Sequence, residues 1–479
     1  MDGHRPLTRT HAIPRIATVA AAAIPAAFLG YFFAYPLLAI IWRGIAPEGI
    51  PGFGPFRDVL GSASLRGVAW FTLWQAVLST MLTLAVGLPT AYVFARFRFP
   101  GKRFLRAAAT VPFVLPTLVV GTAFIALIGP EGALGVDLKG TVAAILIAHV
   151  FYNYAIVVRG VGSFWEQIDP TIEDAARTLG ASRWRTFREI TLPLLAPAIV
   201  SAASLVFLFT FTSFGVVLVL GDLEHATLEV EIWRQTANLL RLDLAAALAI
   251  LQLIGVGLLL IWYGRYQQRR AREIPLRPPA QGARPIRTTG ERLLVAASLG
   301  FMAVFLGTPL AVLVVRSFRT PGGFGLDNYA ALTESGGPGL FVPATEAIGN
   351  TLRFAFAATV LAVAIGALAA ATVAYRRGRL ASLFDAALMV PLGTSAVTIG
   401  FGFLIALDRP VDLRTSAILI PIAHALVAIP FVVRTSLPVM RSVQHRLRQA
   451  AAVLGAGPAR AWREVDLPII SRALLVGAA

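Results

Sequence analysis

The sequence of 479 residues contains no cysteine and few charged side chains. The absence of cysteine excludes a disulfide framework and metal sites built from thiolates. Charged residues make up 14% of the chain and hydrophobic residues 57%, whereas a soluble protein carries about 25% charged residues. Many apolar stretches also exceed the roughly 18 residues that indicate a membrane span. We therefore expect an all-α integral membrane protein that crosses the bilayer many times.

Acidic residues are scarcer than basic ones, 25 against 42, so the formal net charge is +17. A surplus of this size can indicate nucleic-acid binding. Here the basic residues lie in short loops between apolar stretches, where the positive-inside rule places them. We therefore expect the lipid bilayer and no nucleic acid as a partner, with a cytoplasmic N-terminus over residues 1–15. The apolar run 16–42 is too long for a typical signal-peptide core and is interpreted as a retained first span.

Ten full spans and the start of an eleventh are predicted. They cover residues 16–42, 68–94, 107–128, 142–158, 196–220, 243–263, 293–315, 350–374, 384–407 and 414–433, and the last begins near residue 469. Residues 265–292 are rich in Arg, Pro and Gln and are typical of a cytoplasmic linker. This linker divides the chain into two membrane halves, residues 16–264 and 293–479.

A phosphate-binding loop for ATP is missing. The pair Gly101-Lys102 is followed by Arg103 and lacks the upstream glycine spacing that such a loop needs. We expect neither ATP hydrolysis by this chain nor a bound cofactor.

The chain does contain one charged segment that occurs twice. Residues 173–193 (EDAARTLGASRWRTFREITLP) and 448–468 (RQAAAVLGAGPARAWREVDLP) are identical at 10 of 21 positions, at an offset of 275. The similarity continues upstream, because 111–121 resembles 390–400 at an offset of 279. The repeat unit is therefore a six-span half, and an even number of spans makes the two halves parallel.

The repeat also predicts where the second half stops. Ala479 corresponds to Ser204, inside the fifth span of the first half. By symmetry we expect a natural protein of roughly 540 residues, of which this sequence is a truncated copy. A genuinely shorter protein is the alternative.

Each copy of the repeated segment is expected to fold as helix–turn–helix on the cytoplasmic side. Asp169-Pro170 is a favourable start for the first helix, and Gly180 is its expected left-handed end. Ser182 is a candidate N-cap for the second helix, and Gly457-Pro458 occupies the same position in the second copy. Ala175, Ala176 and Leu179 are expected to form a small apolar face, with Trp184 and Phe187 as aromatic anchors.

The spacing of both copies resembles the EAA loop of permeases in binding-protein-dependent ATP-binding-cassette importers. It runs Asp174-Ala175-Ala176, then Gly180, then Leu192-Pro193, although Asp and Gln replace the usual first Glu. The resemblance implies two tandem parallel six-span halves of the type I importer fold in a bacterial inner membrane, with each loop seated on a separate ATPase subunit. It implies as partners two ATPase copies and a periplasmic or lipid-anchored solute-binding protein. The residues assigned to coupling are Asp174, Ala175, Ala176, Gly180, Arg185, Arg188, Glu189, Leu192 and Pro193, and Gln449, Ala450, Ala451, Gly455, Arg460, Arg463, Glu464, Leu467 and Pro468.

The substrate is open at this point. The fused architecture and stretches such as TSFGVVLVLGD resemble thiamine permeases most, with iron(III) permeases as the alternative. Thr210, Thr212 and Ser213 are candidates for the solute pathway, but such hydroxyls equally often bond their own helix. His149 and His424 are equivalent intramembrane histidines, which mark function by default, and a neutral histidine bonded between helices explains both.

Two other transporter classes compete with the importer. A secondary transporter of the major-facilitator kind also has six-span parallel halves, but it usually needs ionisable residues inside its spans. An ion channel needs a filter-like segment, which the sequence lacks. Neither class explains the repeated loop.

Overall fold

The computed structural model describes residues 15–47, 49–270, 283–334, 342–375, 378–442 and 445–478. The predicted N-terminal segment up to residue 14, the centre of the predicted linker and Ala479 lie outside these residues. The chain forms two compact units: unit 1 comprises Met1–Arg43 and Leu332–Ala479, and unit 2 comprises Gly44–Ala331. Each unit is described by itself.

Unit 2 is built almost entirely from helices. Its elements are α3 Gly54–Gly61, α4 Ala63–Arg96, β1 Phe97–Arg98, α5 Lys102–Ala108, α6 Val111–Val114, α7 Thr117–Ile128, α8 Val142–Ile156, η2 Val157–Val161, α9 Gly162–Gln167, α10 Pro170–Thr178, α11 Arg183–Thr186, η3 Phe187–Thr191, α12 Leu192–Phe211, α13 Gly215–Leu220, α14 Leu228–Trp233, η4 Arg234–Asn238, α15 Leu242–Arg270, β2 Arg284–Pro285, α16 Thr289–Ser317, β3 Arg319–Thr320, β4 Gly323–Phe324 and α17 Asp327–Ala330.

Unit 1 is helical as well. Its elements are α1 Arg15–Leu29, η1 Gly30–Ala34, α2 Tyr35–Ile45, η6 Ala331–Thr333, α18 Ala344–Tyr375, α19 Arg379–Met389, η7 Val390–Gly393, α20 Ala396–Ala406, α21 Leu419–Ser442, α22 His445–Val453, α23 Pro458–Ala461, η8 Trp462–Asp466 and α24 Leu467–Ala478. The bounds of α2 and η6 cross into unit 2 by one or two residues.

The prediction of an all-α membrane protein is confirmed, but the predicted number of ten full spans is too high for the described residues. Eight helices are long and apolar enough to cross a membrane, and a ninth span results if the bent pair Lys102–Val114 and Thr117–Ile128 is counted as one. The two parts of that pair meet at 97°. Leu115 is extended there because the following proline, Pro116, disfavours a helical conformation before it.

The same interruption occurs at the corresponding place in unit 1. The predicted span 384–407 is divided into α19, the tight turn η7 and the short helix α20. Thr394 is extended, and the Ser395 side chain accepts a hydrogen bond from the Thr398 amide at 3.1 Å to begin α20. The predicted fifth span is also too long, because α12 ends at Phe211 and α13 is a separate helix.

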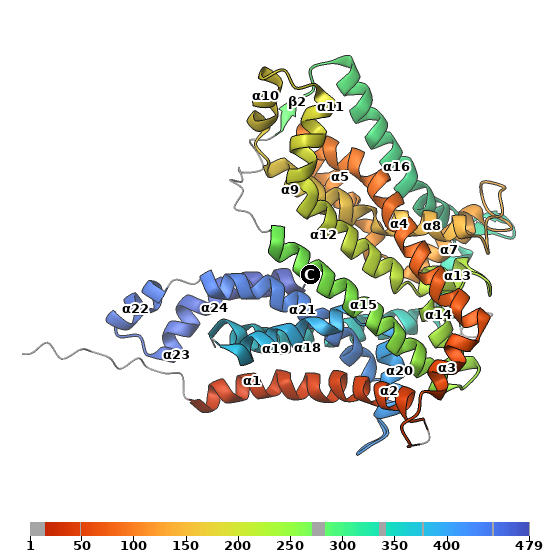
Figure 1. The fold of residues 1–479 in the computed structure, drawn as a ribbon, viewed down its shortest axis with the longest axis vertical. Coiled ribbons are helices and arrows are strands. Elements are labelled where there is room, and N and C mark those ends of the chain that lie inside the picture. Colours follow the sequence, from red (N-terminus) through yellow and green to blue (C-terminus); the bar gives the residue numbers. More distant parts are fainter. Residues whose placement is uncertain are drawn as a thin grey trace, which may run out of the picture. The chain divides into compact units, whose positions relative to one another are not determined.

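Helix α4 is the centre of unit 2 (Figure 1). It packs against α8, α9, α12 and α16. In unit 1, α18 has the corresponding central position and packs against α1, α21 and α24. The first span after the linker, α16, therefore belongs to unit 2, and the first span of the chain, α1, belongs to unit 1. The compact units thus exchange their first spans relative to the repeat in the sequence.

Polar side chains buried on α4 bond to the helices around it. Ser79 Oγ lies 3.0 Å from His149 Nδ1, and His149 Nε2 lies 2.8 Å from Ser213 Oγ. Gln75 donates to the Thr210 carbonyl oxygen at 2.9 Å. These contacts confirm His149 as a histidine hydrogen-bonded between helices. His424 differs from it, because it is exposed.

Two equivalent glycines have different surroundings. A Cβ atom at Gly121 on α7 would lie 2.8 Å from the Val219 side chain on α13, whereas a Cβ at Gly400 on α20 would have no atom within 4 Å. Gly121 therefore permits a close helix contact, and Gly400 does not serve that purpose in the described structure.

This contrast predicts opposite effects of one substitution. Gly121→Ala is expected to lower the free energy of unfolding by about 1–3 kcal/mol, because the stiff Val219 side chain has to move. Gly400→Ala is expected to be neutral or to stabilise by up to about 1 kcal/mol, because alanine favours a helix. Thermal unfolding of the purified protein in detergent measures both, and equal destabilisation by the two variants would contradict the packing at Gly121.

Candidate functional site

The two copies of the repeated segment fold alike. Loop 1, residues 169–193, contains α10, a turn, α11 and η3, and it continues into α12. Loop 2, residues 445–468, contains α22, a turn, α23 and η8, and it continues into α24. The predicted helix–turn–helix is confirmed in both. In Figure 1, α10 and α11 lie at one end of unit 2, away from α13 and α14.

Glycine makes the turn in each loop. Gly180 has φ +86° and Gly455 has φ +83°, a left-handed conformation that side chains disfavour. The residue after each glycine closes the helix, because Ala181 N donates to Ala176 O at 3.0 Å and Ala456 N donates to Ala451 O at 2.9 Å. The predicted left-handed helix ends are therefore confirmed in both copies.

The predicted helix starts are also confirmed. The Asp169 side chain accepts a hydrogen bond from Thr171 N at 2.9 Å, and Pro170 is the first residue of α10. Ser182 Oγ accepts from Arg185 N at 3.2 Å and begins α11. In loop 2 the corresponding helix begins at Pro458. These starts satisfy backbone amides that a helix leaves unpaired.

The predicted apolar face divides between two sides of α10. Ala176 is buried, whereas Ala175 is exposed and Leu179 is 89% exposed. In loop 2, Ala451 is half-buried, Gln449 and Ala450 are exposed and Leu454 is 88% exposed. The sequence predicted one apolar face, but the structure separates its residues. In loop 1, Ala176 packs against unit 2, whereas Leu179 is directed outward.

The aromatic anchors also differ from each other. Phe187 is half-buried and its ring lies 6.4 Å from that of Trp165, whereas Trp184 is 69% exposed. Phe187 is therefore the anchor, and Trp184 adds to the exposed apolar surface of loop 1.

An exposed ion pair recurs on the second helix of each loop. Arg185 Nε lies 3.0 Å from Glu189 Oε2, and Arg460 Nε lies 2.8 Å from Glu464 Oε1. The hydrogen bond that Arg460 donates to the Glu464 carboxylate, together with the negative charge of Glu464, raises the pKa of Arg460 above its ordinary value. Arg188, Arg463, Pro193 and Pro468 are exposed, as is Leu192, while Leu467 is half-buried.

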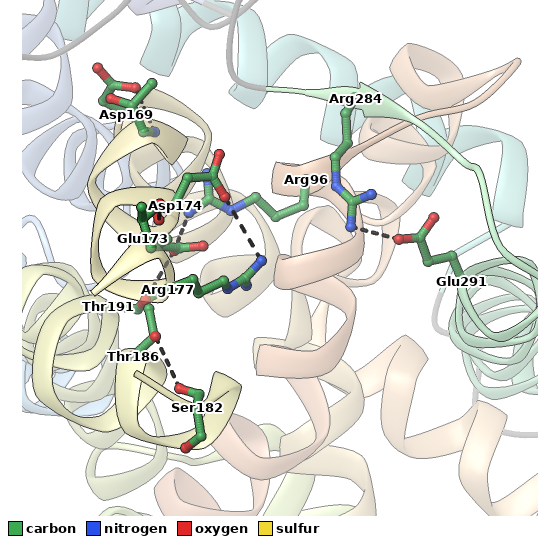
Figure 2. A network of polar contacts seen from close by, with 12 residues as sticks. Arg96, Asp169, Glu173, Asp174, Arg177, Ser182, Thr186, Thr191, Arg284 and Glu291 are labelled. Atoms are coloured by element: carbon green, nitrogen blue, oxygen red, sulfur yellow. Dashed lines mark hydrogen bonds and ion pairs between the residues drawn. The ribbon is translucent and has the colours of Figure 1, made fainter. Parts of the chain in front are cut away.

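The sequence did not indicate what holds loop 1 in place. Glu173, next to the predicted Asp174, forms a buried ion pair with Arg96 at the end of α4, and its Oε1 also accepts from Thr191 Oγ1 at 2.9 Å (Figure 2). Arg96 Nη1 donates to Ile168 O at 3.3 Å, just before α10. Asp174 is instead exposed and lies 3.8 Å from Arg177. Arg96 and Glu173 are far apart in the chain, so no local pattern could connect them.

A second buried carboxylate holds the helix that precedes α10. Glu166 on α9 accepts from Lys102 Nζ at 2.9 Å and from Arg106 Nη2 at 2.8 Å, both on α5. Glu166 and Glu173 thus attach loop 1 to the end of α4 and to α5. A buried pair that loses one partner typically costs about 3–5 kcal/mol, whereas an exposed i,i+4 pair contributes about 0.3–0.5 kcal/mol.

The pathway candidates lie in the buried network of unit 2. Thr210 and Thr212 donate to carbonyl oxygens of their own helix, Val206 O at 2.9 Å and Leu208 O at 2.8 Å. Ser213 bonds His149. Their role in a solute pathway stays a prediction. Within the described residues, no group of three or more His, Asp or Glu side chains is arranged to hold a metal ion.

Comparison with known proteins shows which family this chain belongs to. Residues 84–273 match the model of the binding-protein-dependent transport system inner membrane component. A thiamine transport system permease protein of Brucella abortus is 31% identical over 424 residues, which cover 85% of this chain and 75% of the relative. The chain belongs to this permease family.

Other similar proteins are permeases whose names give a different substrate or none. A probable ABC transporter permease of Sinorhizobium fredii is 25% identical over 92% of this chain and 81% of its own length. The sulfate transport system permease of Escherichia coli is 34% identical, but over 43% of this chain and 78% of its own length. A solved bacterial transporter involved in alginate import is 16% identical, with a TM-score of 0.46, over 54% of this chain and 97% of that one.

The buried and exposed ion pairs of loop 1 give a matched test of how the permease holds this loop. Glu173→Gln is expected to lower the free energy of unfolding by about 3 kcal/mol, because it leaves Arg96 buried without its counter-charge. Glu189→Gln is expected to change it by less than about 0.5 kcal/mol. Thermal unfolding in detergent measures both, and an equally small effect of Glu173→Gln would show that the Arg96 contact adds nothing to stability.

Proposed function

We propose that this permease moves a small solute from an external binding protein into the cytoplasm, driven by two copies of a separate ATPase that dock on loops 1 and 2. The observation that carries the proposal is the same exposed helix–turn–helix in both halves, with left-handed Gly180 and Gly455 and outward Leu179 and Leu454. An apolar side chain that is nearly fully exposed at the same position of two loops is explained by a partner surface that covers it.

The loops suit coupling because each is continuous with an apolar helix. Loop 1 continues through η3 into α12 without a break, and loop 2 continues through η8 into α24. A movement of either loop is therefore transmitted to the helix that follows it. ATPase states that bind inward-facing and outward-facing permease with different affinity would shift the equilibrium between them. The absence of a phosphate-binding loop in this sequence agrees with a separate energy source.

The basic loops favour a cytoplasmic N-terminus, which places both loops on the side where ATP is available. Because the chain belongs to the permease family, a major-facilitator transporter and an ion channel are no longer candidates. The orientation is itself a part of the proposal.

Thiamine is the proposed solute. The Brucella abortus relative named as a thiamine permease matches most of this chain in one alignment, whereas the sulfate permease matches less than half of it. In this arrangement the binding protein carries most of the selectivity, so sulfate is kept as the second candidate and iron(III) as the third.

Docking is tested by placing charge at both turns. Gly180→Asp together with Gly455→Asp is expected to abolish uptake and co-purification of the ATPase, because a side chain disfavours the left-handed conformation and an acidic group enters each contact. Membrane insertion is expected to be unchanged by protease protection and yield. Undiminished co-purification with the ATPase would contradict the docking assignment.

The solute is tested by uptake in cells that lack this gene. Restoring the full transporter is expected to restore accumulation of labelled thiamine at least tenfold over the deletion strain, with labelled sulfate and iron(III) unchanged. Restored sulfate or iron(III) uptake without thiamine uptake would reject thiamine and select the other solute.

A further inference from the structure

Two consecutive residues at the end of α4 contact two different parts of the chain. Arg96 pairs with Glu173 of α10 and donates to Ile168 O, which fixes the start of loop 1. The next residue, Phe97, lies beneath the Arg284 guanidinium, 5.3 Å from ring centroid to Cζ. Arg284 belongs to the last part of the predicted linker. Figure 2 shows the Arg96 side chain directed toward Glu173 of loop 1, and Arg284 paired with Glu291 on the other side of the end of α4.

The end of the linker is held there by further contacts. Phe97–Arg98 and Arg284–Pro285 form a short parallel pair of strands, with Phe97 opposite Arg284 and Arg98 opposite Pro285. Arg284 Nη2 also lies 2.6 Å from Glu291 Oε1. Glu291 and Thr288 form a capping box that begins α16. Buried Phe97, just after α4, and buried Val295 on α16 lie in one apolar cluster.

We propose that loop 1, the end of α4 and the linker end with α16 form one rigid joint, in which Arg96 is the positioning residue that passes movement of loop 1 to α16. This inference rests on the proposed docking of an ATPase at loop 1. Its physical basis is the burial of the Arg96–Glu173 pair, whose side chains are 6% and 16% exposed, in contrast to the exposed pairs on the outer side of both loops.

The residues that form the joint at loop 1 differ from those at the corresponding positions of the repeat. In the repeat, Arg448 occupies the position of Glu173 and Asp466 that of Thr191, while Tyr375 corresponds to Arg96 at the offset of 279. An arginine cannot accept the hydrogen bonds that Glu173 accepts. The two loops therefore share their outward geometry but carry different residues at the positions of Glu173 and Thr191.

The first experiment separates docking from transmission. Arg96→Gln is prepared in the intact transporter, with its ATPase and binding protein, and compared with Arg414→Gln in an exposed ion pair of the α20–α21 connection. We expect the Arg96→Gln transporter to keep its ATPase during co-purification and to keep its basal rate of ATP hydrolysis. The factor by which thiamine-loaded binding protein stimulates ATP hydrolysis is expected to fall at least tenfold. Arg414→Gln is expected to retain that stimulation.

Full stimulation of ATP hydrolysis by the binding protein in the Arg96→Gln variant would overturn the proposed joint. A wild-type permease that captures no ATPase would instead reject the proposed function, so the two failures are distinct. Thr191→Val removes one hydrogen bond to Glu173 and provides a milder variant if Arg96→Gln does not accumulate. It is expected to reduce stimulation two- to fivefold at unchanged co-purification, and unchanged stimulation in Thr191→Val would also count against the joint.

The second experiment tests rigidity directly. Because the chain has no cysteine, Arg98→Cys with Pro285→Cys creates a single disulfide between paired strands, whose spacing suits such a bond. We expect the disulfide to form and uptake to stay within twofold of the same variant under reducing conditions. Failure to form the bond, or uptake that stops on oxidation and returns on reduction, would show that the strands separate and would overturn the proposal.

Discussion

Inside a bilayer every backbone amide and carbonyl has to find its hydrogen-bond partner within the protein, and both units depend on this requirement. It explains why long helices dominate, and why the two breaks are local. At Leu115-Pro116 and at Thr394-Ser395 the chain leaves the helix for a residue or two, and a new helix starts at once. The two breaks occupy equivalent positions of the repeat, so both units interrupt the same span.

Polar side chains in the membrane units are used for packing. The series from Ser79 through His149 to Ser213 joins three segments of unit 2 by buried hydrogen bonds. This network orients α4, which then ends at Arg96. The position of loop 1 is thus connected through one long helix to the buried core.

The two loops share a common exposed surface. Their turns, their exposed leucines and their exposed ion pairs agree between the copies. Glu166 before loop 1 and Glu173 within it hold the loop in place, and the chain carries arginines at both corresponding positions of the repeat, Arg441 and Arg448. Because the two repeats lie in one chain, each can change its own residues without changing those of the other.

The sequence by itself determined the membrane class, the duplication, the loops and their helix ends, because composition, period and glycine or proline positions act locally. It also indicated the family. It did not indicate the two broken spans, because hydropathy measures length and polarity but not direction. The exchanged first spans and the Arg96–Glu173 pair were decided only by the tertiary structure. Contacts between residues far apart in the chain depend on which helices pack together, and no local pattern records that choice.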